Sequence, residues 1–388
     1  MSRYKLKDLL TIQNGKDYKH LNKGSIPVYG SGGLMTYVDD YLSDSESILL
    51  PRKGTLDNIM YVNGKFWTVD TLYWTKINTN IVDTKYLYFY LSVLDLSKKN
   101  SGSTLPSMTF DAYYSIDIEL PSLDMQKKIS KKLFLLQDKI SLNNKINDNL
   151  QQQAKLLYDY WFNQFEFPNE EGKPYKSSGG KMIWNEELKR EIPEGWGVEN
   201  ILENSLSTII KPGIDVFDEK TYYATADVNG TTISEGSIIN YENRESRANM
   251  QPTINSIWFA KMKNSIKHLY LNEEMRDFIN NSILSTGFCG LQCNENSFEY
   301  LASFIEHSYF EILKDTLAHG ATQEAVNNED LSKLPLLIPS FIVLNNFHTS
   351  LQNCYKQISL NICENKQLSQ LRDWLLPMLM NGQATVED

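Results

Sequence analysis

The sequence predicts an α+β protein of two globular α/β domains, each followed by a long helix, with the two helices paired as an antiparallel coiled coil. First, residues 102–162 reappear without a gap as residues 320–380, at an offset of 218 (320 − 102 = 218). A gapless repeat of this length indicates one structural unit used twice. Second, apolar residues in both copies recur in alternating steps of four and three, as in a coiled-coil seam. Third, short runs rich in Tyr, Ile, Val and Thr precede each copy and indicate curved sheets.

The first globular domain is predicted over residues 1–121 and the first long helix over 122–165. Pro121-Ser122 is a suitable helix start, because a serine hydroxyl accepts a hydrogen bond from a free backbone N–H of the first turn. The seam positions of this helix are Ile129, Leu133, Leu136, Ile140, Asn143, Asn147, Leu150, Ala154, Leu157 and Trp161.

The second half repeats this plan after a polar linker at 166–192, which is rich in Gly, Pro and Ser. The second globular domain is predicted over 193–339 and the second long helix over 340–382, where Asn381-Gly382 suits a helix end. Its seam positions are Phe347, Leu351, Cys354, Ile358, Asn361, Asn365, Leu368, Arg372, Leu375 and Leu379.

Each helix places two asparagines at consecutive seam positions near its middle: Asn143 and Asn147, then Asn361 and Asn365. A polar seam residue lowers stability but fixes register and orientation. In an antiparallel pair with a pseudo-twofold axis nearby, the four amides meet and hydrogen-bond one another. A parallel pair would also match them, and two helices that pack only on their own domains are a further alternative. The short linker favours the antiparallel pair, because the first helix then ends beside the start of the second.

The net charge of −10 argues against a strongly basic nucleic-acid binder. Residues 1–121 carry 13 basic and 13 acidic groups, residues 122–165 carry 7 and 4, and residues 193–339 carry 10 and 21. Contact with a polyanion must therefore use local basic clusters. The apolar runs are far shorter than a membrane span, and the four cysteines do not form a disulfide framework. We expect a reduced, cytoplasmic protein without a membrane partner.

Catalytic patterns are missing from the sequence. The glycines at residues 29–33 (YGSGG) form neither a dinucleotide-binding fingerprint nor a P-loop, and a turn beside a binding surface is the better interpretation. Cys289 and Cys293 have no partners at zinc-site spacing, and the five histidines are scattered. The chain is therefore expected to bind a ligand, without a catalytic residue, metal or cofactor of its own.

Several basic loops are candidate contacts with nucleic acid, because Arg and Lys bind phosphates and Arg also recognises guanine edges. In the first domain these residues are Lys16, Lys19, His20, Arg52, Lys53 and the adjacent hydroxyl of Thr55. In the second domain they are Arg244, Arg247, Lys261 and Lys263. For each of these charges, a solvated surface position is the alternative interpretation.

Small polar residues at equivalent places in both halves are further candidates. Ser103 and Thr104 precede the last strand and helix of the first half, and Thr322 and Gln323 occupy the corresponding place in the second. Together with Ser31 of the first glycine-rich turn, they allow a ligand to approach the backbone closely. The alternative is a glycine turn that only the fold requires.

This arrangement resembles the DNA-specificity subunit of type I restriction–modification enzymes. The similarity lies in two variable domains with similar long helices and in the motif PEGW at residues 193–196. It extends to IPVYGSGG at 26–33, LLPRKG at 49–54 and WTVD at 67–70 in the first half. In the second half it extends to GATQ at 320–323 and LLIP at 336–339, so the similarity covers nearly the whole chain.

The resemblance implies that residues 1–121 and 193–339 are target-recognition domains, each reading one half of a bipartite double-stranded DNA site. The two helices would then be the spacer, since a helix of about 40 residues is about 60 Å long. It implies two modification subunits that bind S-adenosylmethionine and methylate adenine. It also implies restriction subunits that use ATP and Mg²⁺ to cut DNA.

Three functional classes remain in competition. The preferred class is a non-catalytic, sequence-specific DNA-binding subunit that directs methylation and restriction by its partners. The alternative is a coiled-coil scaffold that joins two protein-binding domains without DNA recognition, which the charge of the second domain favours. A single-chain enzyme is disfavoured by the missing catalytic motifs.

Overall fold

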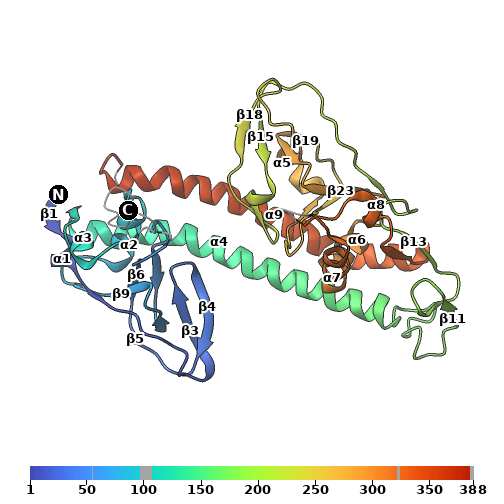
Figure 1. Ribbon diagram of the computed structural model, residues 1–388, viewed down its shortest axis with the longest axis horizontal. Helices are drawn as coiled ribbons and strands as arrows, with labels where there is room; N and C mark the ends of the chain where they lie inside the picture. Colours follow the sequence, from blue (N-terminus) through green and yellow to red (C-terminus); the bar gives the residue numbers. More distant parts are fainter. Residues whose placement is uncertain (55, 97–106, 321–323, 385–388) are drawn as a thin grey trace. The chain divides into compact units, whose positions relative to one another are not determined.

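The computed structural model describes residues 1–54, 56–96, 107–320 and 324–384, and the chain divides into two compact units (Figure 1). Unit 1 comprises Met1–Lys139 with Leu368–Asp388, and unit 2 comprises Ile140–Gln367. The predicted domains set the long helices apart from the globular segments. In the structure, by contrast, each unit contains a globular segment and a portion of both helices.

Unit 1 contains two four-stranded sheets. One has the strand order β2-β9-β6-β7 with antiparallel neighbours, and the other has the order β4-β3-β8-β5, in which β3 and β8 run parallel. The strands are β1 (Ser2–Lys5), β2 (Leu10–Gln13), β3 (Lys23–Gly30), β4 (Gly33–Val38), β5 (Ser43–Asp44), β6 (Ser47–Pro51), β7 (Met60–Val62), β8 (Lys65–Thr68), β9 (Leu72–Ile77) and β10 (Asp117–Leu120). The short helices are α1 (Leu6–Leu9), α2 (Thr84–Ser92) and α3 (Phe110–Tyr114).

Unit 2 repeats this topology. Its sheets have the orders β14-β23-β20-β21 and β18-β15-β22-β19, and β15 and β22 again form the parallel pair. The strands are β11 (Met182–Asn185), β12 (Arg190–Pro193), β13 (Gly197–Asn200), β14 (Ser207–Ile209), β15 (Lys220–Tyr223), β16 (Val228–Asn229), β17 (Thr232–Ile233), β18 (Ser237–Ile239), β19 (Ala248–Met250), β20 (Ser256–Ala260), β21 (His268–Leu271), β22 (Ser282–Ser285), β23 (Phe288–Cys293) and β24 (Pro335–Ile338). The short helices are α5 (Arg276–Asn280), α6 (Phe298–Glu306), α7 (Ser308–Leu317) and α8 (Asn328–Leu331), with 3₁₀ turns at Thr225–Asp227 and Glu273–Met275.

A two-stranded antiparallel pair closes each globular segment just before its long helix. In unit 1, β1 pairs with β10 so that Ser2 faces Leu120. In unit 2, β13 pairs with β24 so that Gly197 faces Ile338. Leu120 and Ile338 differ by the repeat offset of 218 (338 − 120 = 218). The duplicated sequence therefore folds into duplicated structure, and the predicted α+β class is confirmed.

The long helices are α4 (Leu123–Tyr158), which continues as a π-helical turn at Asp159–Asn163, and α9 (Phe341–Met380). At the start of α4 the Ser122 hydroxyl lies 3.4 Å from the Met125 amide, in the predicted capping position. After α9, Gly382 adopts a φ of 69°, a left-handed conformation that glycine adopts without strain.

The two helices pair antiparallel, as predicted. Within unit 1, the Arg372 guanidinium donates to Gln137 Oε1 at 2.8 Å, and Leu133 belongs to one core cluster with Leu376 and Leu379. Within unit 2, the rings of Trp161 and Phe347 lie 5.5 Å apart. Residue numbers therefore fall along α9 as they rise along α4. In each unit, apolar residues of both long helices therefore belong to the same core cluster as the globular segment.

The segment predicted as a linker is more ordered than its composition indicated. Phe165, just before this segment, and Phe167 within it are buried in the largest core cluster. Phe167 stacks on Trp196 with 5.0 Å between ring centres. Further along the segment, β11 and β12 form a hairpin. Gly, Pro and Ser provide the turns, and the aromatic residues between them anchor the segment to unit 2.

Candidate nucleic-acid interface

In unit 1, loops from four separate strands meet at one edge. The Arg52 amide, directly after β6, donates to Thr71 O at 2.9 Å in the turn between β8 and β9. From the loop after β2, the Lys16 amide donates to Thr68 O at 2.8 Å. The Val69 amide donates to Tyr29 O at 3.0 Å, near the end of β3. Side chains from all four loops are therefore presented along one edge.

The basic turn of unit 1, which we define as Arg52–Gly54, lies within this edge. Arg52 is half-buried, with its guanidinium carbon 5.8 Å from the centre of the Tyr73 ring and Nη1 donating to Asp70 O at 3.4 Å. Lys53 is exposed. Gly54 has a φ of 89°, and a Cβ added there would lie 3.3 Å from Ser31 Oγ. The structure thus brings Ser31, Arg52 and Lys53 together, as a shared binding surface requires.

The predicted basic loop after β2 belongs to the same edge. The indole Nε1–H of Trp67 donates to Lys16 O at 2.8 Å, and the His20 ring packs edge-on against Trp67 at 5.9 Å. The side chains of Lys16, Lys19 and His20 are exposed. This loop is therefore anchored by its backbone and by one aromatic contact, while its cations face solvent.

Unit 2 has an equivalent edge with the same backbone bonds. The Lys261 amide, directly after β20, donates to Gly287 O at 3.0 Å, as the Arg52 amide does to Thr71 O. Val326 N donates to Lys261 O at 2.9 Å, and Met108 N donates to Arg52 O at 3.0 Å. Met108 and Val326 differ by the repeat offset of 218 (326 − 108 = 218). The basic turn of unit 2, defined as Lys261–Lys263, therefore occupies the place of the basic turn of unit 1.

The charges at the unit 2 edge are more strongly neutralised. Lys263 Nζ forms an ion pair with Glu324 at 2.8 Å. Arg247 is exposed, and its carbonyl accepts from the Thr286 amide at 2.9 Å, next to the residue that binds Lys261. Arg244 instead lies over the ring of Tyr241 at 3.9 Å and donates to the Tyr241 carbonyl. The structure thus brings Arg247 to the edge with Lys261. The Arg244 side chain instead bonds within its own turn, to Tyr241.

Five of the candidate residues lie outside the described part of the chain: Thr55, Ser103, Thr104, Thr322 and Gln323. Described residues just after the two small polar stretches do contact the basic turns. Ser107 forms a β-bridge with Lys53, and Ala325 forms one with Met262.

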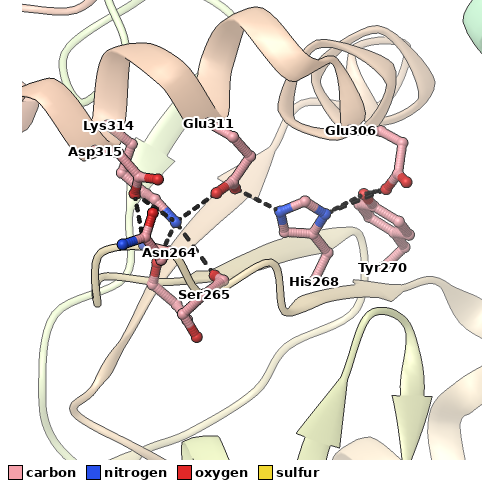
Figure 2. A network of polar contacts seen from close by, with 9 residues as sticks. Asn264, Ser265, His268, Tyr270, Glu306, Glu311, Lys314 and Asp315 are labelled. Carbon is pink, nitrogen blue, oxygen red and sulfur yellow. Dashed lines mark hydrogen bonds and ion pairs between the residues drawn. The ribbon is translucent and has the colours of Figure 1, made fainter. Parts of the chain in front are cut away.

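Figure 2 shows a polar network in unit 2 that extends from Ser265 and Lys314 to Glu306. His268 Nε2 lies 2.9 Å from Glu311 Oε1, and His268 Nδ1 lies 3.2 Å from Glu306 Oε2. Lys314 is fully buried, with Nζ 2.6 Å from Glu311 Oε2. The Tyr270 hydroxyl also donates to Glu306.

Hydrogen bonds within the network favour the charged forms of its members, although burial opposes them. Burial disfavours the charged form of His268, but hydrogen bonds to Glu306 and Glu311 outweigh this effect and raise the pKa of His268. Burial opposes ionisation of both glutamates as well, yet the hydrogen bond from His268 lowers the pKa of Glu306 and of Glu311. Sequence analysis did not predict this network, whose one local signal is the spacing of Glu311 and Lys314 on one helix face.

The seam asparagines lie within unit 2 and hydrogen-bond across the helix pair. Asn143 Nδ2 donates to Asn365 Oδ1 at 2.9 Å, and Asn361 Nδ2 donates to Asn147 Oδ1 at 2.7 Å. The two bonds are equivalent under the repeat, because 361 − 143 and 365 − 147 both equal 218. This arrangement places a pseudo-twofold axis of the helix pair between them.

The chain is thus built from two units of one topology that present different side chains at equivalent edges. Residues 1–152 match the family model described as type I restriction modification DNA specificity domain. The chain is 26% identical over 324 residues to the type I restriction enzyme MjaIX specificity subunit of Methanocaldococcus jannaschii, which covers 79% of this chain and 70% of that protein. It is 24% identical over 389 residues to the HindI specificity subunit of Haemophilus influenzae, which covers 84% of this chain and 82% of that protein. By these matches the chain is similar to the specificity subunits of type I restriction enzymes.

A solved structure shares the fold. The crystal structure of a type I restriction–modification system S subunit from M. genitalium has a TM-score of 0.55 and 12% identity, over 97% of this chain and 95% of that one. Within the described residues, no three His, Cys, Asp or Glu side chains are grouped as around a metal ion. Nor does any helix in that part of the chain have the length and apolar character needed to cross a membrane.

Proposed function

We propose that the chain recognises a bipartite site on double-stranded DNA, with one half read by each unit. The bound chain directs adenine methylation and restriction by partner subunits, and the paired helices set the spacing between the halves. The observation that carries the proposal is the basic turn at the same strand end in both units. Equivalent backbone bonds hold the two turns, whose side chains differ. A shared frame with different side chains suits two half-sites of different sequence.

The chemistry of the two edges supports contact with DNA. Lys16, Lys19 and Lys53 are exposed cations at or beside the unit 1 edge and suit phosphates. Arg52 is held by Tyr73 and Asp70, and a held guanidinium suits bidentate recognition of guanine better than a freely moving one. The unit 2 edge offers Lys261 and Arg247, with Lys263 partly neutralised by Glu324.

The partners we propose are two modification subunits together with restriction subunits. Exposed apolar residues outside the seam occur in repeat-related pairs, Leu142 with Leu360 and Leu156 with Trp374. Equivalent apolar surfaces suit two copies of one partner. In this proposal S-adenosylmethionine, ATP and Mg²⁺ are bound by these partners in the cytoplasm.

The proposal predicts that Arg52→Ala affects one half-site only. In the complex assembled with its modification subunits, we expect Arg52→Ala to lower discrimination at that half by about 1–3 kcal/mol and to leave the other half unchanged. Binding to DNA libraries randomised in one half-site at a time measures both effects. Arg3→Ala is the matched control, because Arg3 is an exposed arginine of unit 1 that is paired with Glu119.

Two results would contradict the proposal. If the wild-type complex shows no sequence preference, the chain is a scaffold of protein-binding domains. If Arg52→Ala reduces discrimination equally at both halves, the units do not read separate half-sites.

A further inference from the structure

We propose that Tyr113 in unit 1 and Lys314 in unit 2 are positioning residues for the two basic turns. Each is a buried hydrogen-bond donor to the last carbonyl of a central strand, directly before the basic turn. The inference rests on the proposed function, because it explains how the turns are held in a fixed geometry for DNA recognition.

In unit 1 the peptide group between Pro51 and Arg52 is fixed at both of its polar atoms. The hydroxyl of Tyr113, a fully buried residue of α3, donates to Pro51 O at 2.8 Å. The amide of Arg52 donates to Thr71 O at 2.9 Å. A peptide group bonded at both its C=O and its N–H cannot rotate without losing a bond. Its orientation, and with it the start of the turn, is therefore set.

In unit 2 the peptide group between Ala260 and Lys261 is fixed in the same way. Lys314 Nζ donates to Ala260 O at 3.3 Å, and the Lys261 amide donates to Gly287 O at 3.0 Å. Lys314 Nζ also donates to Ser265 O at 3.2 Å, beyond the turn (Figure 2). One ammonium group therefore bonds the chain before and after the basic turn.

The turn of unit 2 is held at a third point. The amide of Asn264 donates to Asp315 Oδ1 at 3.1 Å, and Asn264 has a φ of 54°, in the left-handed region that asparagine tolerates better than most residues. Asp315 follows Lys314 on α7. Lys314 and Asp315 of α7 therefore hold the chain at three points around the turn: the Ala260 carbonyl, the Asn264 amide and the Ser265 carbonyl.

The two donors come from different helices. Leu331 of α8 occupies in unit 2 the repeat position of Tyr113 (331 − 113 = 218), and it is buried. A leucine side chain has no hydrogen-bond donor, and in unit 2 Lys314 of α7 bonds the equivalent carbonyl instead. Each unit therefore has a donor to the same carbonyl, placed on a different helix.

Loss of either donor would leave a buried carbonyl without its side-chain partner, and the peptide group would gain freedom to rotate. Recognition of base edges requires side chains held within about 0.5 Å of their productive position. We therefore expect removal of either donor to weaken sequence discrimination by the unit that contains it, and to leave the other unit unaffected.

The test uses Tyr113→Phe and the paired variant Lys314→Met with Glu311→Gln, each in the complex with the modification subunits. The paired variant avoids leaving the Glu311 carboxylate buried beside a lost cation, and glutamine still bonds His268. Each complex is assayed on the full site and on sites with one mismatch in either half. Arg52→Ala and Lys261→Ala assign the halves to the units. We expect discrimination to fall about tenfold at the half read by the altered unit, with no change at the other half.

The controls are Tyr4→Phe and Lys173→Met, which make the same substitutions elsewhere in unit 1 and unit 2. Thermal unfolding of every variant sets an assay temperature at which all are folded. If folded Tyr113→Phe and paired-variant complexes discriminate as the wild type does, the inference is wrong, while an effect of Arg52→Ala leaves the proposed function standing. Equal losses at both halves would also overturn it, and absence of any preference in the wild type would overturn both proposals.

Discussion

Four ionisable side chains of unit 2, His268, Glu306, Glu311 and Lys314, are stabilised chiefly by one another. Burial of charged groups costs free energy unless they are paired, and removing one member leaves the rest uncompensated. The network therefore contributes little net stability as a whole but makes unit 2 sensitive to the charge of each member.

The charge on His268 predicts a pH dependence of stability. Because its pKa is raised by folding, its contribution is fully present below the ordinary value of 6.5 and is lost as pH rises through the folded pKa. We expect His268→Gln to lower the free energy of unfolding by about 1–3 kcal/mol at pH 6, and by less at pH 9. Thermal unfolding of both proteins at each pH measures the difference.

Acid has the opposite effect through the carboxylates. The folded pKa values of Glu306 and Glu311 are lowered, so their contribution is present above the ordinary value of 4.5 and is lost as pH falls through the folded values. The groups that face these charges are Tyr270, Lys314 and, near Glu306, Lys155.

A His268→Gln effect of equal size at pH 6 and pH 9 would contradict a charged histidine.

At the residue scale, sequence predicted the basic residues but not the groups that hold them. Arg52 and Lys261 follow apolar runs that read as strands, so their position at strand ends could be inferred. No pattern in the sequence singled out Tyr113 or Lys314. Their role depends on which carbonyl they reach in three dimensions, and that requires the packing of helices on strands.

Among the elements, α4 and α9 show how polar seam residues act in this fold. The bonds from Asn143 to Asn365 and from Asn361 to Asn147 form only in one register of the antiparallel pair. A shift of one turn would bury amides without partners. The asparagines thus favour a single register at the expense of apolar contact.

This arrangement predicts opposite effects for single and complete replacement. Asn361→Leu alone removes the donor to Asn147, whose buried amide oxygen then lacks that bond, and we expect a loss of about 1–3 kcal/mol. Replacing all four asparagines with leucine removes the donors and acceptors of these bonds together, so no seam asparagine is left without its partner. Stability should then be unchanged or rise by about 1–4 kcal/mol. Thermal unfolding measures both changes.

Register is measured separately, by disulfide trapping between cysteines introduced at facing positions and at positions shifted by one turn. The wild type should cross-link only the facing pair, and the fourfold variant should cross-link both. A stabilising effect of Asn361→Leu alone would show that the amide pairs do not set the register.

Among the elements, the sequence was most informative where a regular pattern continued over many residues. The alternating steps of four and three identified both helices, and the repeat indicated that the two domains share a scaffold. The order of short strands was not predictable, because the parallel pairing of β3 with β8 joins segments that no local pattern connects. The aromatic anchor Phe167 was likewise not predicted, because it lies in a segment with the composition of a linker.

For the molecule as a whole, charge is the main constraint on DNA binding. The net charge of −10 opposes approach to a polyanion, and residues 193–339, with 10 basic and 21 acidic groups, are the main source of the acidic excess. The ion pair between Lys263 and Glu324 withdraws a further cation from the unit 2 edge.

Removing this acidic partner should strengthen binding. We expect Glu324→Gln to raise the affinity of the assembled complex for DNA, because Lys263 becomes available to a phosphate. The slope of log affinity against log salt should steepen by about 0.9, the value for one additional phosphate contact. Glu171→Gln is the matched control, because it frees the exposed Lys173 away from the edge. Equal effects of the two variants would place Lys263 outside the DNA contact.

The division of α9 between the units has a consequence for biosynthesis. Ile129 and Leu133 share a core cluster with Leu376, Leu379 and Met380, which the ribosome makes more than two hundred residues later. Unit 1 is therefore begun first and completed last, after the segment that forms unit 2 has emerged. Until then Ile129 and Leu133 lack part of the apolar core that buries them, and a premature stop near residue 368 would leave that core incomplete.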